Sequence, residues 1–400
     1  MTSSSPSGGE AGLLVVLAGI QFTHILDFMV LMPLGPQLMR LWDIDARQFG
    51  VLVSAYTFTA AVTALLCAFY IDRFDRRRAL LFLYAGFAIS TLLCALAPNY
   101  QWLLAARAAA GAFGGVLNAA VYSIIGDTIP DSRRGSALGT LMIAFPVSAV
   151  FGVPLGLSLA NLWDWRAPFF FVCGIAALIL IAAAKTVPSV RGHVEHARSQ
   201  NPFGLVRAVF ADTNHRHALA FISLLIFGGF SVIPFIAPYM VANVHLKETD
   251  LPWLYFFGGL ASVFTSRLIG RLTDRHGKKQ MFTVIAAISI APLLITTNLP
   301  PVPVWLAIGS SVLFMVFVSG RFVPAMALVT SAAQPKVRGG FMSFNTAIQQ
   351  LALSLASLSS GYLIGHGPNG QLTRYWLVGL ISVACALTCI GLVRSIETRS

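Results

Sequence analysis

The segment YIDRFDRRR at residues 70–78 recurs in altered form as RLTDRHGKK at residues 271–279. Asp72 and Asp274 occupy matching places in the two segments and are 202 residues apart. A second pair of similar segments, PDSRRG and PKVRG, places Arg134 and Arg338 204 residues apart. Two unrelated landmarks at nearly the same spacing indicate that the second half of the chain repeats the first.

Long apolar runs fill the sequence between these basic segments. The 400 residues are 56% hydrophobic and 10% charged, whereas an average soluble domain carries roughly 25% charged residues. Helices of about 20 residues cross ~30 Å of hydrocarbon, and the alternating pattern of barrel strands is absent. We therefore predict an all-α membrane protein with spans at 12–34, 48–71, 79–97, 102–126, 137–160, 167–185, 217–241, 252–273, 281–298, 303–329, 339–364 and 375–394.

The net charge of +12 comes from Lys and Arg residues that are unevenly distributed between the two ends of the spans. If the N-terminus is cytoplasmic, 19 of the 27 basic residues fall on the cytoplasmic side, five on the other side and three within spans. The positive-inside rule therefore predicts that both termini are cytoplasmic. A nucleic-acid partner is not expected, because the basic residues are dispersed over short loops.

The longest polar connection divides the spans six and six. We predict a disordered tail at 1–11, a six-helix bundle at 12–185, a cytoplasmic linker at 186–216, a second six-helix bundle at 217–394 and a C-terminal tail at 395–400. The N-terminal segment lacks the basic region of a cleaved signal peptide. The five cysteines lie in spans without metal-ligand spacing, and no P-loop or nucleophile motif is visible. We expect no metal, no cofactor and no enzymatic activity.

The segment after the second span resembles the signature of the major facilitator superfamily, usually G-x-L-A-D-R-x-G-R-K. Ala68 and Asp75 stand where the signature has glycines, and the second copy restores both as Gly270 and Gly277. The matching residues of the first copy are Asp72, Arg73, Arg76 and Arg77. The resemblance implies two pseudo-symmetric six-helix bundles around a central substrate site.

Further segments resemble the twelve-helix drug:proton antiporter branch of this family. LLAARAAAGAFGG at 103–115 is similar to the helix-4 motif with its buried arginine, here Arg107, and WDWRAPFF at 163–170 is similar to the entry to helix 6. QFTHILDFMVLMPLGPQL at 21–38 and GRFVPAMALVTSA at 320–332 resemble the sugar-efflux, arabinose-efflux-permease-like members. FGVPLGLS at 151–158 departs from the helix-5 antiporter motif, and ordinary helix packing explains its small residues equally well.

Asp27 is the only acidic residue well inside a predicted span. A rise of 1.5 Å per residue places Asp27 ~6 Å and Arg107 ~9 Å outward of the midpoints of their spans, at similar depth. Burial raises the pKa of a carboxyl and a nearby arginine lowers it, so Asp27 is a candidate for proton coupling. A purely structural ion pair with Arg107 is the alternative. His24 and Gln21 continue a polar stripe at i, i+3 spacing, with His24 as a proton relay or as a neutral hydrogen-bonding group.

Other polar residues of the spans are candidates for the substrate cavity. Arg321 has no acidic partner within the predicted spans. A water-filled cavity or an anionic substrate group would lower the free-energy cost of placing its charge in the membrane. Asn345 and Gln349 share a helix face and would bind a sugar hydroxyl or hydrogen-bond a neighbouring helix. The cavity candidates are Gln21, Asn118, Tyr239, Arg321, Asn345, Gln349 and Gln350.

The family resemblance also implies a cytoplasmic latch. Asp72 would face the start of helix 11, and Arg76 would meet an acid at the end of helix 4, a place that Asp127 occupies. A carboxylate is favoured at a helix N-terminus, and arginine binds carboxylate in a bidentate manner. Arg73 and Asp274 complete the latch candidates from the two copies of the signature.

The leading function hypothesis is a secondary transporter that exports a drug or a sugar-like metabolite in exchange for protons. Proton-coupled uptake by symport is the alternative, and a non-transporting membrane sensor or assembly subunit is the hypothesis from another class. The expected partners are a small-molecule substrate, protons and the lipid bilayer. We expect a monomer in the inner membrane of a bacterium.

Overall fold

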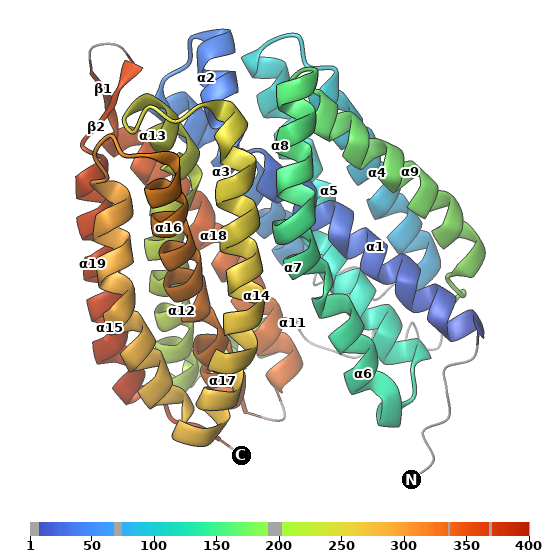
Figure 1. Ribbon diagram of the computed structural model, residues 1–400. Helices are drawn as coiled ribbons and strands as arrows, with labels where there is room; N and C mark the ends of the chain where they lie inside the picture. The colour runs from blue at the N-terminus through green and yellow to red at the C-terminus, as the bar shows by residue number, and fades with distance from the viewer. Residues whose placement is uncertain (1–7, 68–73, 191–201, 335–336, 368–369, 400) are drawn as a thin grey trace.

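The computed structural model describes residues 8–67, 74–190, 202–334, 337–367 and 370–399, and the described part is mainly helical (Figure 1). In the first half of the chain the elements are α1 (Gly8–Val30), α2 (Gly35–Trp42), α3 (Ala46–Cys67), α4 (Arg76–Ala95), α5 (Tyr100–Thr128), α6 (Asp131–Met142), α7 (Ala144–Val147), the π-helix η2 (Ser148–Gly152), α8 (Val153–Leu162) and α9 (Ala167–Thr186).

The second half begins after a short helix, α11 (Pro202–Ala211), within the predicted linker. Its elements are α12 (Thr213–Val232), η3 (Ile233–Phe235), α13 (Ile236–Ala242), η4 (Glu248–Asp250), α14 (Leu251–His276), α15 (Lys278–Thr297), α16 (Val304–Phe314), the π-helix η5 (Met315–Ser319), α17 (Phe322–Ala332), α18 (Arg338–Leu363), a hairpin of β1 (Gly365–His366) and β2 (Leu372–Thr373), α19 (Tyr375–Leu392) and η8 (Val393–Ser395).

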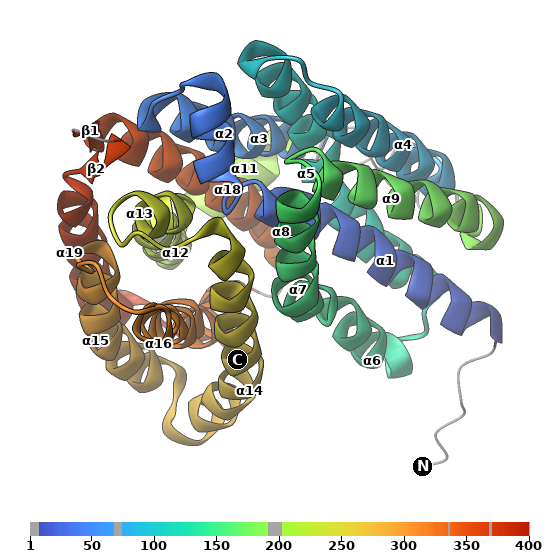
Figure 2. The ribbon, with the colours of Figure 1, turned by 45° about the horizontal axis from the view of Figure 1, so that its top comes forward.

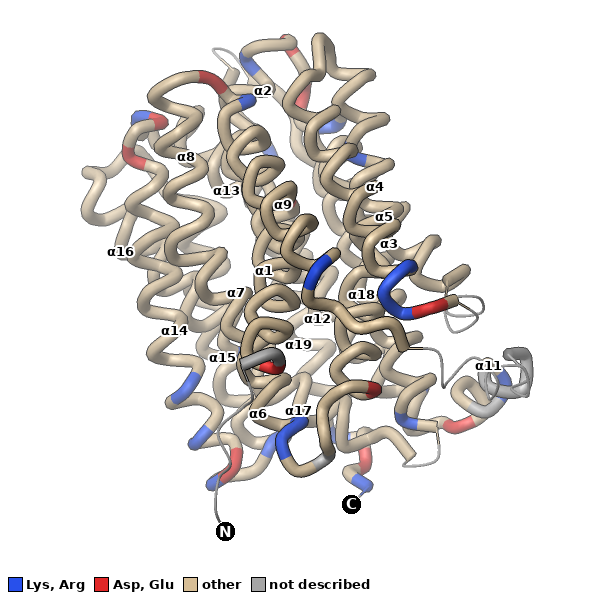
Figure 3. Tube along the Cα trace, turned by 90° about the vertical axis from the view of Figure 1, so that its right-hand side faces the viewer, with Lys and Arg blue, Asp and Glu red and all other residues tan. Residues whose placement is uncertain are grey.

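Ten helical stretches among the described residues are long and apolar enough to cross a membrane. They coincide with ten of the twelve predicted spans, and α14 and α18 cover the other two. Most Lys, Arg, Asp and Glu residues lie near the ends of the helices (Figure 3). The all-helical membrane fold is thus confirmed, whereas twelve crossings and the cytoplasmic position of the termini stay predictions.

Both marked termini lie at the same end of the helix bundle (Figure 1). We call this end the inner end, in keeping with the predicted orientation, and the opposite end the outer end. The first span ends four residues earlier than expected, because α1 ends at Val30 and a turn precedes α2. Pro33 and Pro36 explain the break, since proline removes a backbone donor and disfavours helix in the residue before it.

Side-chain caps mark several helix starts. Asn99 accepts a hydrogen bond from the Trp102 N–H at 2.9 Å before α5, and Asp75 accepts one from the Arg78 N–H at 3.0 Å before α4. Such caps satisfy amide groups that have no partner within the helix. Asp75 stands where the family signature has glycine, so this departure supplies a cap.

The two halves of the chain are joined at the outer end by a common apolar core. This core includes Leu26 and Phe49 from the first half and Phe235 and Leu293 from the second, and the Phe49 and Phe235 rings meet edge to face at 5.8 Å. Toward the inner end each half has a largely separate core, around Leu117 and Ile124 in the first half and around Phe221 and Leu328 in the second. Figure 2, in which the outer end comes forward, shows α1, α4 and α9 on one side and α12, α15 and α19 on the other.

A close backbone approach between the halves involves two glycines. A Cβ atom on Gly50 of α3 would lie 2.6 Å from the Ser357 carbonyl oxygen and 3.1 Å from the Gly361 Cα of α18. Only glycine permits this packing. Nearby, the Ser354 hydroxyl donates to the Ser54 carbonyl at 3.3 Å. These contacts lie in the outer half of the two helices.

Polar contacts add to the closure of the outer end. Arg40 of α2 and Glu248 of η4 form an ion pair with Nη1 and Oε1 2.5 Å apart. Asn161 of α8 donates to the Glu248 carbonyl at 3.1 Å and accepts from the Gln37 amide at 3.0 Å. Every hydrogen bond between the two halves that joins described residues lies in the outer half of the molecule.

Candidate functional site

Asp27 and Arg107 form a buried ion pair within the first half. Arg107 Nη1 lies 2.7 Å from Asp27 Oδ2 and 3.3 Å from the Asp27 carbonyl oxygen. The two side chains are 0% and 1% exposed. Removal of one partner of a buried ion pair leaves an uncompensated charge in the interior, which typically costs about 3–5 kcal/mol. The structure thus brings together the two residues that the sequence placed at similar depth.

Two residues that the sequence analysis did not single out complete this pair. Thr91 of α4 donates its hydroxyl hydrogen to Asp27 Oδ1 at 3.2 Å. The ring of Tyr56 of α3 lies under the Arg107 guanidinium, with Cζ 4.4 Å from the ring centroid, in a cation–π contact. The pair is therefore held by side chains from α1, α3, α4 and α5.

One glycine of α5 sets the position of Tyr56. A Cβ atom on Gly111 would lie 2.0 Å from the Tyr56 carbonyl oxygen and 2.5 Å from Thr59 Oγ1. The Thr59 hydroxyl also donates to the Ala108 carbonyl across the same contact at 2.7 Å. Since no larger residue fits, this glycine allows α3 and α5 to approach closely enough for Tyr56 to stack on Arg107.

Beside the ion pair lies a group of buried polar atoms without hydrogen-bond partners among the described residues. They are both ring nitrogens of His24, the Tyr56 hydroxyl and Arg107 Nε, and farther along α1 Gln21 Oε1 is also without such a partner. A Cβ atom on Gly114 would lie 2.6 Å from the Tyr56 hydroxyl and 3.1 Å from His24 Nε2, so these two groups face the same glycine. Buried polar atoms of native proteins are almost always hydrogen-bonded, to protein or to water. This group is therefore suited to bind water or polar atoms of a ligand.

Candidates from the second half are dispersed. The Arg321 side chain is buried, and its Nη1 donates to the Ser289 hydroxyl at 3.3 Å. Asn345 of α18 is buried, and neither atom of its amide has a partner among the described residues. The Gln349 amide nitrogen lies 3.9 Å from Met326 Sδ.

Tyr239 and Asn118 are two further cavity candidates. The Tyr239 hydroxyl donates to the Leu299 carbonyl at 3.1 Å near the outer end of its span, where its ring packs against Tyr375. Asn118 is partly buried on α5. The cavity roles of all these residues stay predictions.

Part of the predicted latch lies in the described region. Arg76 Nε donates to Asp127 Oδ2 at 2.8 Å, so the end of α5 meets the start of α4 as the resemblance implied. Asp72 and Arg73 lie outside the described residues. Asp274 is exposed at the inner end of α14 and forms no ion pair with another described residue.

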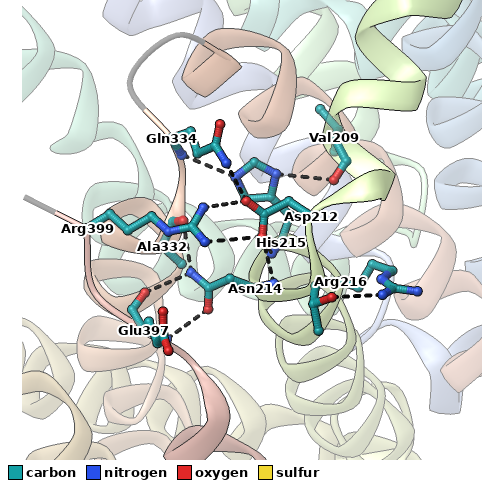
Figure 4. A network of polar contacts seen from close by, with 10 residues as sticks. Val209, Asp212, Asn214, His215, Arg216, Ala332, Gln334, Glu397 and Arg399 are labelled. Atoms are coloured by element: carbon teal, nitrogen blue, oxygen red, sulfur yellow. Dashed lines mark hydrogen bonds and ion pairs between the residues drawn. The ribbon is translucent and has the colours of Figure 1, made fainter.

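A separate polar network at the inner end joins the start and the end of the second half (Figure 4). The Asp212 carboxylate accepts hydrogen bonds from the side chains of Arg399 and Gln334 and from the Asn214 N–H. The hydrogen bond from Arg399 lowers the pKa of Asp212 to about 2. The Asn214 amide bonds the Glu397 backbone through both its oxygen and its nitrogen, at 2.8 and 2.9 Å. We call this network the C-terminal clasp.

The sequence is similar to those of known membrane transporters. The sequence model of the Major Facilitator Superfamily matches residues 17–215 and 219–399. The chain is 24% identical over 346 residues to the uncharacterized MFS-type transporter YceJ of Bacillus subtilis (strain 168), a match that covers 86% of this chain and 87% of the relative. It is 25% identical over 238 residues to the "Probable sugar efflux transporter" of Helicobacter pylori (strain P12), a match that covers 60% of each protein.

Solved structures share the fold. A bacterial homolog of the human lysosomal transporter Spinster, in an inward-facing and occupied conformation, aligns with a TM-score of 0.73 over 98% of this chain and 95% of its own, at 16% identity. A D-xylose-proton symporter aligns with a TM-score of 0.73 over 95% of this chain and 96% of its own, at 18% identity.

Proposed function

Because the chain belongs to the Major Facilitator Superfamily and is a multi-pass membrane transporter, we propose that it exports a small organic molecule in exchange for protons. The transported molecule is a drug or a sugar-like metabolite, in keeping with the name of the Helicobacter pylori relative. The membrane is the inner membrane of a bacterium. The observation that carries the proposal is the buried Asp27–Arg107 pair.

Protonation of Asp27 changes the energy of this pair. Ionised Asp27 is held by Arg107 and by Thr91. Once protonated, it loses the charge attraction, whereas Arg107 keeps its contact with the Tyr56 ring. A neutral carboxyl is also cheaper to bury than a charged one. Proton binding therefore alters the packing of α1 against α4 and α5, which is what coupling to alternating access requires.

A route for the proton is supported by the polar stripe of α1. His24 and Gln21 precede Asp27 on the inner side of the helix, and their buried polar atoms lack partners among the described residues. Water bound between them would link the inner end to the carboxylate. The closed outer end, with its ion pair and shared core, supports a cycle in which the outer mouth opens only after the proton state changes.

Transport by the Asp27→Asn variant tests the proposal. A substrate is first identified in a bacterial host that lacks its main efflux pumps, as a molecule whose export depends on this chain. Proteoliposomes loaded with that substrate then receive a pH gradient. We expect uphill movement by the wild type, exchange without uphill movement by Asp27→Asn, and partial uphill movement by Asp27→Glu.

The exposed Asp164, at the outer end, provides the matched control as Asp164→Asn, which is expected to behave as the wild type. Uphill movement by Asp27→Asn at the wild-type rate would contradict the coupling role and leave Asp27 as a structural partner of Arg107. Movement of substrate in the same direction as the protons would establish symport.

A further inference from the structure

Arg321 is a buried cation that the proposed proton pathway does not use. It lies between the π-helix η5 and α17, and its side chain is 2% exposed. The position is only ~5 Å inward of the middle of the 304–332 span, at 1.5 Å per residue. Single π-helical turns are frequently found at functional sites, because they interrupt the regular hydrogen-bond pattern.

The guanidinium of Arg321 has few partners. Its one side-chain hydrogen bond among the described residues joins Nη1 to the Ser289 hydroxyl of α15, although a guanidinium carries five N–H donors. The acidic residues described in the second half lie at helix ends or in loops and tails, and none comes within 4 Å of Arg321: they are Asp212, Glu248, Asp250, Asp274 and Glu397. Arg107, in contrast, has Asp27.

The structure leaves room beside this guanidinium. If Gly229 of α12 carried a Cβ atom, Arg321 Nη2 at 3.8 Å would be its one contact within 4 Å among the described residues, apart from the adjacent residues and backbone of its own helix. The adjacent Gly228 differs, because its Cβ would lie 2.9 Å from Cys385 Cβ. A Cβ atom on Gly229 would therefore touch little besides the guanidinium, whose Nε and Nη2 have no hydrogen-bond partner among the described residues, whereas Gly228 is needed for close packing of α12 against α19.

We propose that Arg321, Ser289 and the space at Gly229 form a site for a carboxylate group of the transported molecule. A carboxylate matches the fork of N–H donors of arginine and supplies the missing negative charge. The inference rests on the proposed transport function and deepens it by assigning the substrate class: a small organic acid, such as a sugar acid. Exchange of one such monoanion outward for one proton inward moves two elementary charges, so transport is strongly electrogenic.

Ligand-dependent thermal unfolding of the purified full chain tests the site. The probes are sodium D-galacturonate, sodium acetate and sodium chloride, with D-galactose as the neutral counterpart of galacturonate, all at constant pH and ionic strength. We expect a carboxylate to raise the unfolding temperature of the wild type in a saturable way. In Arg321→Gln its apparent affinity is expected to fall about tenfold or more.

Two glycine variants separate the site from general stability. Gly229→Val fills the space without removing the charge and is expected to weaken carboxylate binding. Gly174→Val is the matched control, because a Cβ on Gly174 of α9 would contact nothing within 4 Å. Arg321→Lys keeps the charge if Arg321→Gln does not fold, and is expected to retain weakened binding.

The outcomes decide between the inference and its alternatives. Equal carboxylate shifts in wild type and Arg321→Gln, or no carboxylate shift in the wild type, would overturn it. A shift with chloride that no carboxylate reproduces would indicate an adventitious ion only. Asp27→Asn is expected to bind carboxylate normally. Carboxylate binding by the wild type without any proton-driven transport would refute the proposed function and leave the site intact.

Discussion

Arg40 and Glu248 form an ion pair across the boundary between the two halves at the outer end, with Nη1 2.5 Å from Oε1. The Arg40 side chain is 68% exposed, so the pair contributes at most about 1 kcal/mol. A contribution of this size suits a contact that breaks in the proposed transport cycle, because it changes the ratio of two conformations only about fivefold.

Charge reversal at Arg40 is expected to loosen the outer end. In Arg40→Glu, hydrogen exchange measured by mass spectrometry is expected to quicken up to about fivefold in residues 35–42 and 243–250. The swap Arg40→Glu with Glu248→Arg is expected to restore slow exchange. Arg166→Glu is the control at the same end, since Arg166 pairs within its own half. Equal exchange in all variants would show that the apolar core alone closes this end.

Removal of one member of the Asp27–Arg107 pair is expected to destabilise more than removal of both. Arg107→Gln leaves a buried carboxylate without its cation, at a cost of about 3–5 kcal/mol. The double variant Asp27→Asn with Arg107→Gln is expected to unfold at a higher temperature than Arg107→Gln. Thermal unfolding of the four proteins at pH 7 measures this coupling, and strictly additive effects would contradict an energetic link.

Gly111 is expected to tolerate no side chain. In Gly111→Ala the new methyl group would lie 2.0 Å from the Tyr56 carbonyl oxygen, so α3 and α5 would have to separate. We expect a loss of several kcal/mol or failure to accumulate in the membrane. Gly126→Ala on the same helix is the control, because its Cβ meets nothing within 4 Å and alanine favours helix by about 1 kcal/mol over glycine. Equal abundance and unfolding temperature of the two variants would count against the close contact.

The C-terminal clasp is expected to give a pH-dependent contribution to stability. The hydrogen bond from Arg399 lowers the pKa of Asp212 from 3.8 to about 2. A carboxyl with a lowered pKa stabilises the fold fully above its ordinary pKa, and this stabilisation is lost as the pH falls through the lowered value. Asp212→Asn is therefore expected to lower the unfolding temperature by a few degrees at pH 7, with the difference from wild type shrinking below about pH 4.

Asp274→Asn is the control for this pH series, because Asp274 is an exposed aspartate at the same end. It is expected to leave the unfolding temperature unchanged across the range. A difference between wild type and Asp212→Asn that stayed constant from pH 7 to pH 3 would rule out the charge of Asp212 as its source.

The sequence was sufficient for features that depend on position along a single helix. Helix length and the rise per residue predicted that Asp27 and Arg107 lie at similar depth, and the family resemblance predicted that Arg76 meets Asp127. Both pairs are present in the structure. Thr91 and Tyr56 were missed, because an isolated threonine or tyrosine in an apolar helix carries no sign of which neighbour it meets. Tyr56 reaches Arg107 where α3 and α5 approach closely at Gly111, and Thr91 reaches Asp27 from α4; both depend on contacts between helices. The Arg40–Glu248 pair joins residues 208 apart in two short helical segments, where the periodicity of a single helix gives no information about the partner.

Asp212 and Arg399 lie at the two extremities of the second half and hold each other there (Figure 4). The segment between them is thereby closed into a loop by its own side chains, independently of the first half. The protein is therefore suited to being split into two fragments expressed from separate genes. The division would fall within residues 191–201. In a fragment that holds the second half alone, the same adjacency suits circular permutation, with a new terminus opened elsewhere and the two ends of this half joined by a short peptide.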